Sequence, residues 1–194
     1  MKKFFKSDWF KCTAVLLSLL IVLGGTLAIL NDVLFVSPEE RTARAINKIY
    51  GSVPDYKVVL DIDANDNAVS NDFGSIEKIY QVGEDMLFKS TGINGYKGGT
   101  ITLWLKVIKE NEHYKIDKIV LDGYDKQTLM SKFTQPYFDN FLIDVTDAYE
   151  KEDFIFSNKA NASGLQNPMS GATYSANAAC NAVNCVISYL GGVL

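Results

Sequence analysis

The sequence predicts an α+β fold, in which a single N-terminal transmembrane helix is followed by an antiparallel sheet with packed helices. Three observations predict it: an uncharged apolar run over residues 13–30, five short runs rich in β-branched and aromatic residues between 56 and 121, and a C-terminal segment whose apolar residues recur at helical spacing. The chain has 194 residues, of which 47% are hydrophobic and 12% aromatic. This is enough for one globular domain with its own core, but too little for two.

The apolar run over residues 13–30 has the length of a membrane span. Eighteen helical residues cover about 27 Å, close to the ~30 Å hydrocarbon core of a bilayer, and a second apolar patch extends the segment to residue 36. A cleaved signal peptide is the alternative, since Thr26-Leu27-Ala28 resembles a small-residue cleavage site. The apolar region of a signal peptide usually has only ~7–15 residues. The greater length favours a retained transmembrane helix over residues 13–36, with membrane lipid around it.

Charge is unevenly divided about this span. The overall formal charge of −4 divides into +3 for residues 1–12, which carry four lysines against one aspartate, and −7 for the rest. Positively charged flanks stay in the cytoplasm, which predicts a single-pass protein of the cell membrane with a cytoplasmic N-terminus (1–12) and an extracytoplasmic C-terminal domain. An acidic domain does not attract a phosphate backbone, so nucleic acid is not an expected partner.

Beyond the span, the sequence divides into a juxtamembrane helix and one domain. The Ser-Pro-Glu-Glu tetrapeptide at residues 37–40 has the form of a helix start and Gly51 is typical of a helix end, so we expect a helix over residues 37–51. The domain over residues 52–194 begins with the sheet, whose last two strands form a hairpin at Asn111. The expected strands are 56–62, 77–82, 86–90, 100–108 and 114–121, followed by a helix over 126–133, a turn at Pro136 and a final helix over 175–190.

Acidic, histidine and cysteine residues form no recognised metal-binding motif. The segment over residues 61–72 begins like a calcium-binding loop, but Asp66 stands where that loop needs Gly, and an Asp replaces the bidentate Glu at its end. We interpret it as a solvated acidic turn. The three cysteines and the single His113 do not have zinc-ligand spacing. Cys180 and Cys185 point in different directions on the expected helix, so we predict buried thiols there instead of a disulfide.

The most informative segment is the Ser-Gly-Ala-Thr-Tyr-Ser run at residues 170–175, which precedes a helix with an apolar stripe. Ser175 is expected to be the N-cap of this helix. Gly171 and Ala172 are small enough to let a ligand approach the backbone, and the positive end of the helix favours a phosphate. The pattern predicts an anion pocket with two hydroxyls, those of Thr173 and Ser175, within reach. An ordinary loop into a capped helix accounts for the same residues.

Ser170-Gly171-Ala172-Thr173 ahead of a small-residue helix resembles the flavinylation motif of the FMN-binding domain in the G subunit of Rnf complexes and the C subunit of the sodium-pumping Nqr complex. In that family, a flavin transferase of the ApbE type joins FMN through its phosphate to the threonine of the motif. The resemblance implies covalent FMN on Thr173, with Ser175 and the other motif residues around it.

Two further segments bear on this resemblance. The Gly-Tyr-Lys-Gly-Gly turn at residues 95–99 resembles the family's Gly-Tyr-x-Gly element, whose glycines would let the backbone approach the flavin. The family usually has Asp three residues before the motif's Ser, where this chain has Asn167, and its Glu-Thr-Pro-Gly loop is replaced here by Gln-Thr-Leu-Met at residues 127–130. The flavin contacts that the resemblance implies in these segments are Gly95, Tyr96, Gly98 and Thr128.

The resemblance implies an electron-transfer role. FMN accepts a hydride or passes single electrons, and the protein supplies position and electrostatics. The expected function is an FMN-carrying subunit of an Rnf-type or Nqr-type ion-translocating oxidoreductase complex, with its other membrane subunits and an ApbE-type flavin transferase as partners. Two alternatives remain: a stand-alone flavinylated carrier outside the membrane, and a non-redox anchored interaction module. The sequence contains no acid–base pair or nucleophile arrangement that indicates an independent enzyme.

Overall fold

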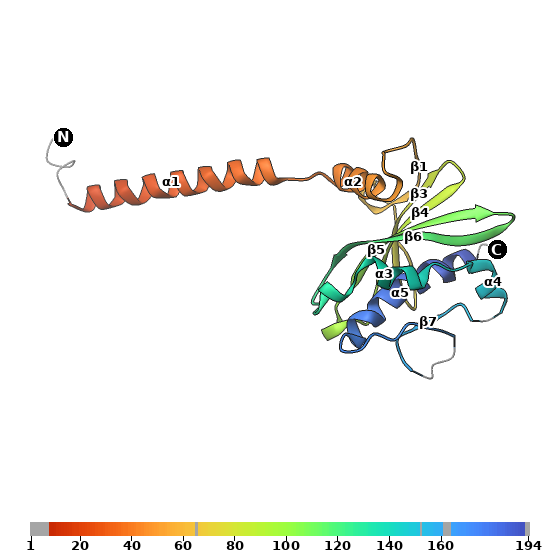
Figure 1. Cartoon of the computed structure of the whole chain (residues 1–194). Coiled ribbons are helices and arrows are strands. Elements are labelled where there is room, and N and C mark those ends of the chain that lie inside the picture. The colour runs from red at the N-terminus through yellow and green to blue at the C-terminus, as the bar shows by residue number, and fades with distance from the viewer. Residues whose placement is uncertain (1–7, 65, 152, 161–163, 193–194) are drawn as a thin grey trace. The chain divides into compact units, whose positions relative to one another are not determined.

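A computed structural model describes residues 8–64, 66–151, 153–160 and 164–192 (Figure 1). Two compact units are present, Met1–Arg41 and Thr42–Leu194. The larger unit combines an antiparallel sheet with packed helices. The predicted α+β class is therefore confirmed.

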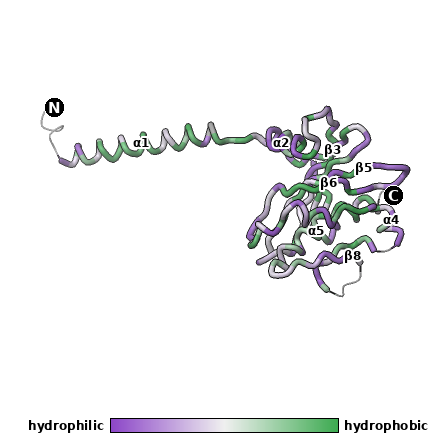
Figure 2. The backbone as a smooth tube through the Cα atoms, in the orientation of Figure 1, coloured by the Kyte–Doolittle hydropathy of each residue, from purple (hydrophilic) through white to green (hydrophobic). Residues whose placement is uncertain are grey.

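The smaller unit is dominated by helix α1 (Asp8–Leu34). Within the described residues, this is the one helix that is long and apolar enough to cross a membrane, with the candidate span at Asp8–Asn31. Most of its length is hydrophobic in Figure 2. The helix has the properties of either a membrane anchor, which the sequence favours, or a signal sequence.

Helix α2 (Pro38–Tyr50) begins and ends as expected. The Ser37 hydroxyl accepts a hydrogen bond from the Glu40 backbone N–H at 3.1 Å, which caps the helix start. Gly51, at φ 77°, ends it in the left-handed region that glycine adopts without strain. Within the larger unit, Ala45 and Ile46 are buried against the sheet. Their partners on the strands are Tyr80, Leu87, Trp104 and Val120.

The sheet has the antiparallel topology that the sequence predicts. Its order is β1-β3-β4-β5-β6, and the short β2 also pairs with β3. β5 and β6 form a hairpin whose turn residues, Asn111 and Glu112, both have positive φ. The strands are β1 (Lys57–Asp61), β2 (Val69–Asn71), β3 (Gly74–Val82), β4 (Asp85–Gly92), β5 (Ile101–Glu110) and β6 (His113–Tyr124).

The main core lies between the sheet and the C-terminal helix α5 (Thr173–Gly191). Small residues on α5 allow a close approach to the strands, and the buried Phe88 and Leu103 of the sheet pack in the same cluster as Ala179 and Val183 of the helix. Cys180 and Cys185 are free and buried, as expected. The remaining elements are α3 (Gln135–Phe138), α4 (Val145–Glu150), β7 (Phe156–Ser157), β8 (Leu165–Gln166) and the 3₁₀ turns Ile62–Ala64, Tyr96–Gly98, Met130–Lys132 and Asp139–Phe141.

Three local predictions are wrong. The segment over residues 126–133 contains only a 3₁₀ turn at Met130–Lys132, because Lys126 and Leu129 have positive φ and interrupt any helix. Pro136 lies inside α3, near its start, where proline fits a helix. The final helix begins two residues earlier than expected, at Thr173.

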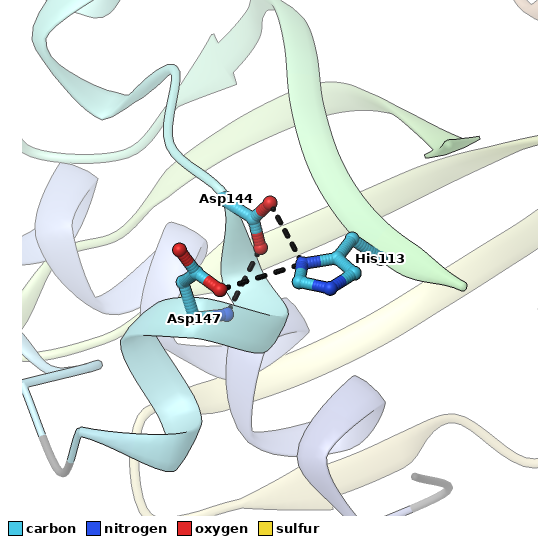
Figure 3. Close-up of side chains that lie close together, drawn as sticks. All are labelled: His113, Asp144 and Asp147. Atoms are coloured by element: carbon cyan, nitrogen blue, oxygen red, sulfur yellow. Dashed lines mark hydrogen bonds and ion pairs between the residues drawn. The ribbon is translucent and has the colours of Figure 1, made fainter. Parts of the chain in front are cut away.

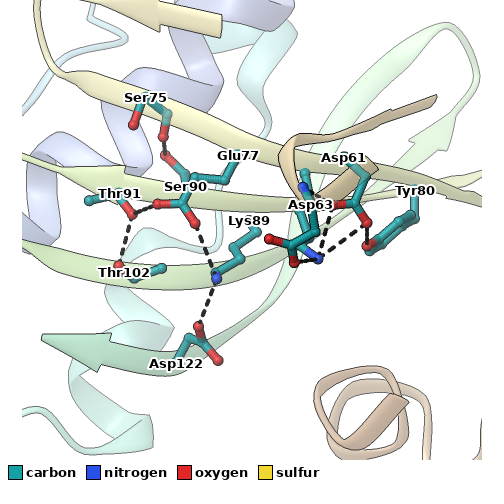
Figure 4. A network of polar contacts seen from close by, with 11 residues as sticks. Asp61, Asp63, Ser75, Glu77, Tyr80, Lys89, Ser90, Thr91, Thr102 and Asp122 are labelled. Atoms are coloured by element: carbon teal, nitrogen blue, oxygen red, sulfur yellow. Dashed lines mark hydrogen bonds and ion pairs between the residues drawn. The ribbon is translucent and has the colours of Figure 1, made fainter. Parts of the chain in front are cut away.

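The acidic turn after β1 is not simply solvated. The buried Lys78 Nζ lies 3.0 Å from Asp61 Oδ1 and 2.7 Å from Asp63 Oδ2, and the Tyr80 hydroxyl donates to Asp61 Oδ2 (Figure 4). Burial by itself would raise the pKa of the Asp61 carboxyl. Hydrogen bonds from Tyr80 and Lys78 outweigh that effect and hold this pKa below its usual value. The carboxylates of Asp61 and Asp63 therefore balance the charge of the buried Lys78 ammonium.

We expect this ion pair to make the domain sensitive to acid. Because the pKa of Asp61 is lowered in the folded state, its stabilising contribution is present above the unfolded pKa of about 3.9 and is lost as the pH falls below it. Asp61→Asn should lower the free energy of unfolding near neutral pH by about 1–3 kcal/mol and flatten its dependence on pH below about 4. Urea unfolding at several pH values measures both effects. An unchanged acid slope in the variant would contradict this assignment.

Candidate functional site

The candidate site lies at the N-terminus of α5. The N-cap residue is Ala172, with φ −128°, and no side chain caps the helix. Ser175 is therefore not the N-cap; it is the third residue of the helix. The first backbone N–H groups of a helix have no partner within it, and alanine is among the poorest capping residues. A helix of 19 residues thus begins with uncapped donors and a positive dipole end, an arrangement that suits a phosphate.

The two predicted hydroxyls have different surroundings. Thr173 is exposed, whereas Ser175 is only 2% exposed and its Oγ donates to the Thr128 carbonyl at 3.4 Å. Ser175 therefore fixes a neighbouring loop. Ser170 is exposed as well, three residues before Thr173 on the adjoining loop. Of the two helix hydroxyls, only that of Thr173 is accessible to a modifying enzyme.

A buried asparagine holds the loop that leads into α5. Asn158 is 5% exposed, and its Nδ2 donates to the Thr173 carbonyl at 3.0 Å while its Oδ1 accepts from the Met169 N–H at 2.7 Å. Asn167, also 5% exposed, donates its backbone N–H to the Ser157 carbonyl at 2.8 Å. Its side-chain Nδ2 is buried without a partner among the described residues. The loop therefore contains one buried donor without a partner in the described part of the chain, at a position where the family that the motif resembles usually has Asp.

Lys132 adds a positive charge beside this loop. Its Nζ donates to the Ser170 carbonyl at 2.6 Å and lies 3.0 Å from where a Cβ on Gly171 would stand. Gly171 itself has φ 78°, a conformation that favours glycine. Although the domain is acidic as a whole, the start of α5 thus has a local positive charge. A lone lysine in an irregular segment gives no sequence signal, so sequence reasoning missed it.

The turn at residues 95–99 meets the segment at residues 127–130. The Tyr96 N–H donates to Gln127 Oε1 at 3.0 Å, and Gln127 Nε2 donates to the Asp125 carbonyl at 2.7 Å. A Cβ on Gly95 would lie 2.6 Å from Gln127 Nε2, and one on Gly99 would lie 2.1 Å from the Asp125 carbonyl. These two glycines are therefore required by contacts within the protein. That Gly95 also lets a flavin approach the backbone stays a prediction.

Gly98 differs from its neighbours in this turn. Its φ is 69°, which favours glycine, and a Cβ on it would meet nothing within 4 Å. The space beside it is open. Because Gln127 contacts the turn and the Thr128 carbonyl contacts Ser175, the three segments that the resemblance singled out are linked in one region.

The surroundings of the α5 start offer both apolar and polar contacts. Leu129 is 49% exposed and Tyr174 is 65% exposed. Leu129 follows Thr128 in the chain and Tyr174 precedes Ser175, and these two neighbours are joined by a hydrogen bond. Exposed apolar side chains of this kind can pack on a planar ligand. A polar pocket of about 240 Å³ lies along the first turns of α5. Its lining is Asn94, Phe156, Ser157, Asn158, Lys159, Asn177, Cys180 and Asn181.

Comparison with known proteins adds no assignment. No protein-family model matches the chain, and no match was found among the curated proteins or the solved structures. The function is therefore inferred from the residues themselves. Three features fit an anionic group: the uncapped N–H donors, the exposed Thr173 hydroxyl and the Lys132 ammonium beside Gly171.

Proposed function

We propose that the chain is a membrane-anchored flavoprotein that carries FMN as a phosphoester on Thr173 and relays electrons in an Rnf-type or Nqr-type ion-translocating complex. An ApbE-type flavin transferase is the proposed modifying partner. The observation that carries the proposal is the uncapped start of α5, where the Thr173 hydroxyl is exposed and Lys132 lies beside the preceding Ser170 and Gly171. Thr173 is also the threonine of the segment that resembles the flavinylation motif.

The residues around Thr173 have complementary roles in this proposal. The N–H groups at the helix start and the Lys132 ammonium would balance the charge of the phosphoester. Ser175 would hold the Thr128 carbonyl and with it the 127–130 segment. Leu129, Tyr174 and the open side of Gly98 would contact the planar ring. When bound, FMN supplies the electron transfer, and the chain determines its position.

A stand-alone flavinylated carrier is the second candidate. The 127–130 segment departs from the family's loop, and its Gln127 is used to fix the turn at residues 95–99. The flavin surroundings of this chain therefore differ from those expected in a complex subunit. Neighbouring genes for integral membrane subunits would favour the complex, and their absence would favour the carrier.

Co-expression with a flavin transferase tests the proposal. We expect the intact mass of the full-length protein to increase by one FMN when a competent ApbE-type enzyme is present, and the protein band to show flavin fluorescence in a denaturing gel. Without the enzyme, neither change is expected. A known flavinylated substrate expressed in parallel verifies that the transferase is active. An unmodified chain beside a modified substrate would overturn the proposal.

A further inference from the structure

A cluster of side chains that can bind a metal lies at the turn of the β5–β6 hairpin. The start of α5 is near the opposite end of β6. His113 is the first residue of β6, and Asp144 and Asp147 come from the start of α4. Ligand atoms of the three residues all lie within 4.8 Å of one another. Figure 3 shows the imidazole directed between the two carboxylates. β6 extends roughly 35 Å from His113 to its other end, so this cluster is separate from Thr173.

Backbone contacts hold the three residues in place. The Ile116 N–H donates to the Ile143 carbonyl at 2.9 Å, the Tyr114 N–H donates to Thr146 Oγ1 at 2.9 Å, and Lys115 forms an antiparallel bridge with Asp144. The chain before α4 is thus attached to the edge of β6 next to His113. The positions of the ligands are consequently set by secondary structure, not by flexible loops.

The two carboxylates are oriented by different contacts. Asp144 caps α4 by accepting the Asp147 N–H on Oδ1 at 2.9 Å, which leaves its Oδ2 directed at His113 Nδ1, 3.2 Å away. Asp147 Oδ1 lies 3.4 Å from the same nitrogen, while its Oδ2 is 3.4 Å from Lys151 Nζ. With His113 neutral, the cluster carries two negative charges and one imidazole nitrogen. An exposed lysine on one side compensates only part of that charge.

Two of the three distances between ligand atoms fit a tetrahedral metal ion. Ligand bonds of 2.0–2.1 Å to zinc place neighbouring ligand atoms about 3.3 Å apart, and the two nitrogen–oxygen distances here are 3.2 and 3.4 Å. An imidazole with two carboxylates suits zinc and similar transition metals, whereas Ca²⁺ and Mg²⁺ prefer oxygen ligands alone. The side chains are between 34% and 47% exposed. An ion can therefore enter from solvent and complete its coordination with water.

We propose that His113, Asp144 and Asp147 bind one divalent transition-metal ion such as Zn²⁺. The ion joins the tip of the β5–β6 hairpin to the start of α4, and thereby stabilises the folded domain against unfolding. The proposal does not depend on the proposed flavin site.

Zinc titration of the full-length protein in detergent tests this proposal. Cys12 is an exposed thiol and is replaced by Ser in every sample, so that it does not compete for the metal. After removal of metal with a chelator, we expect calorimetry to show one equivalent of Zn²⁺ bound and the thermal unfolding midpoint to increase with Zn²⁺. The same concentrations of Mg²⁺ should produce neither effect.

Two variants and one matched control decide the outcome. His113→Gln and Asp144→Asn should each weaken Zn²⁺ binding at least tenfold and remove the thermal shift; asparagine is a good N-cap, so α4 is retained. Glu150→Gln removes a carboxylate from the same helix outside the cluster and should bind as the parent does. Equal affinity in His113→Gln, or no Zn²⁺ binding by the parent, would overturn the proposal and leave a simple histidine–carboxylate contact.

Discussion

Thr173→Val is expected to abolish covalent flavin attachment completely. Valine keeps the branched shape of threonine at the first position of α5 but lacks the hydroxyl that would form the phosphoester. Because Thr173 is exposed and is not part of the hydrophobic core, the variant should fold like the parent. Intact mass after co-expression with the transferase should show the unmodified chain alone, and circular dichroism should be unchanged.

Two control variants sharpen the assignment. Thr173→Ser keeps a hydroxyl at the same place and should retain measurable flavinylation. Ser175→Ala removes a hydroxyl that is 2% exposed and already donates to the Thr128 carbonyl, so the flavin should remain attached. Flavin still bound to Thr173→Val, or mapped by peptide mass to Ser170, would refute Thr173 as the attachment residue.

Gly92→Ala is expected to prevent the native packing of α5 on the sheet. A Cβ at this position would lie 2.0 Å from the Ala178 carbonyl oxygen and 2.2 Å from the Ala182 backbone nitrogen. Both atoms belong to the backbone of a buried helix, so no side-chain rotation relieves the clash. The loss in the free energy of unfolding should exceed the ~1–3 kcal/mol usual for an added methyl group in a core.

Gly123→Ala is the matched control for this prediction. Gly123 is also in a strand, but a Cβ on it would meet nothing within 4 Å. Alanine there should change the free energy of unfolding by no more than about 0.5 kcal/mol. Urea unfolding compares the two variants, and the yield of soluble protein serves where Gly92→Ala does not fold. Similar stabilities for both variants would contradict a close approach of α5 to β4.

The hairpin and the final helix show why much of the fold could be predicted from the sequence. β-branched and aromatic residues on both sides of Asn111 indicated β5 and β6, and the structure places the turn there. The apolar stripe of the final helix likewise identified a buried helix. Both signals are local and repeat along the segment. A single misread residue therefore moves an end of the element by only one or two positions.

The interrupted segment after β6 shows why other parts could not be predicted. Residues 126–133 have a composition compatible with a helix, but Lys126 and Leu129 have positive φ because the chain turns back to meet residues 95–99 and Ser175. Asp61 and Asp63 similarly look like a solvated turn until β3 brings Lys78 between them. These features depend on residues that are distant in the sequence.

By itself, the sequence determined the apolar N-terminal helix, the antiparallel sheet, the buried helical tail and Thr173 as the candidate residue, because each depends on a short pattern of hydrophobicity or residue type. Only the tertiary structure decided that Ser175 is buried, that Lys132 stands beside Gly171, and that His113 meets two aspartates. The local charge and the accessibility of a site depend on all the residues around it, including those that are distant in the sequence. Lys132 and Ser170 are 38 positions apart, and His113 and Asp144 are 31 positions apart, so nothing in the sequence indicates that they are in contact.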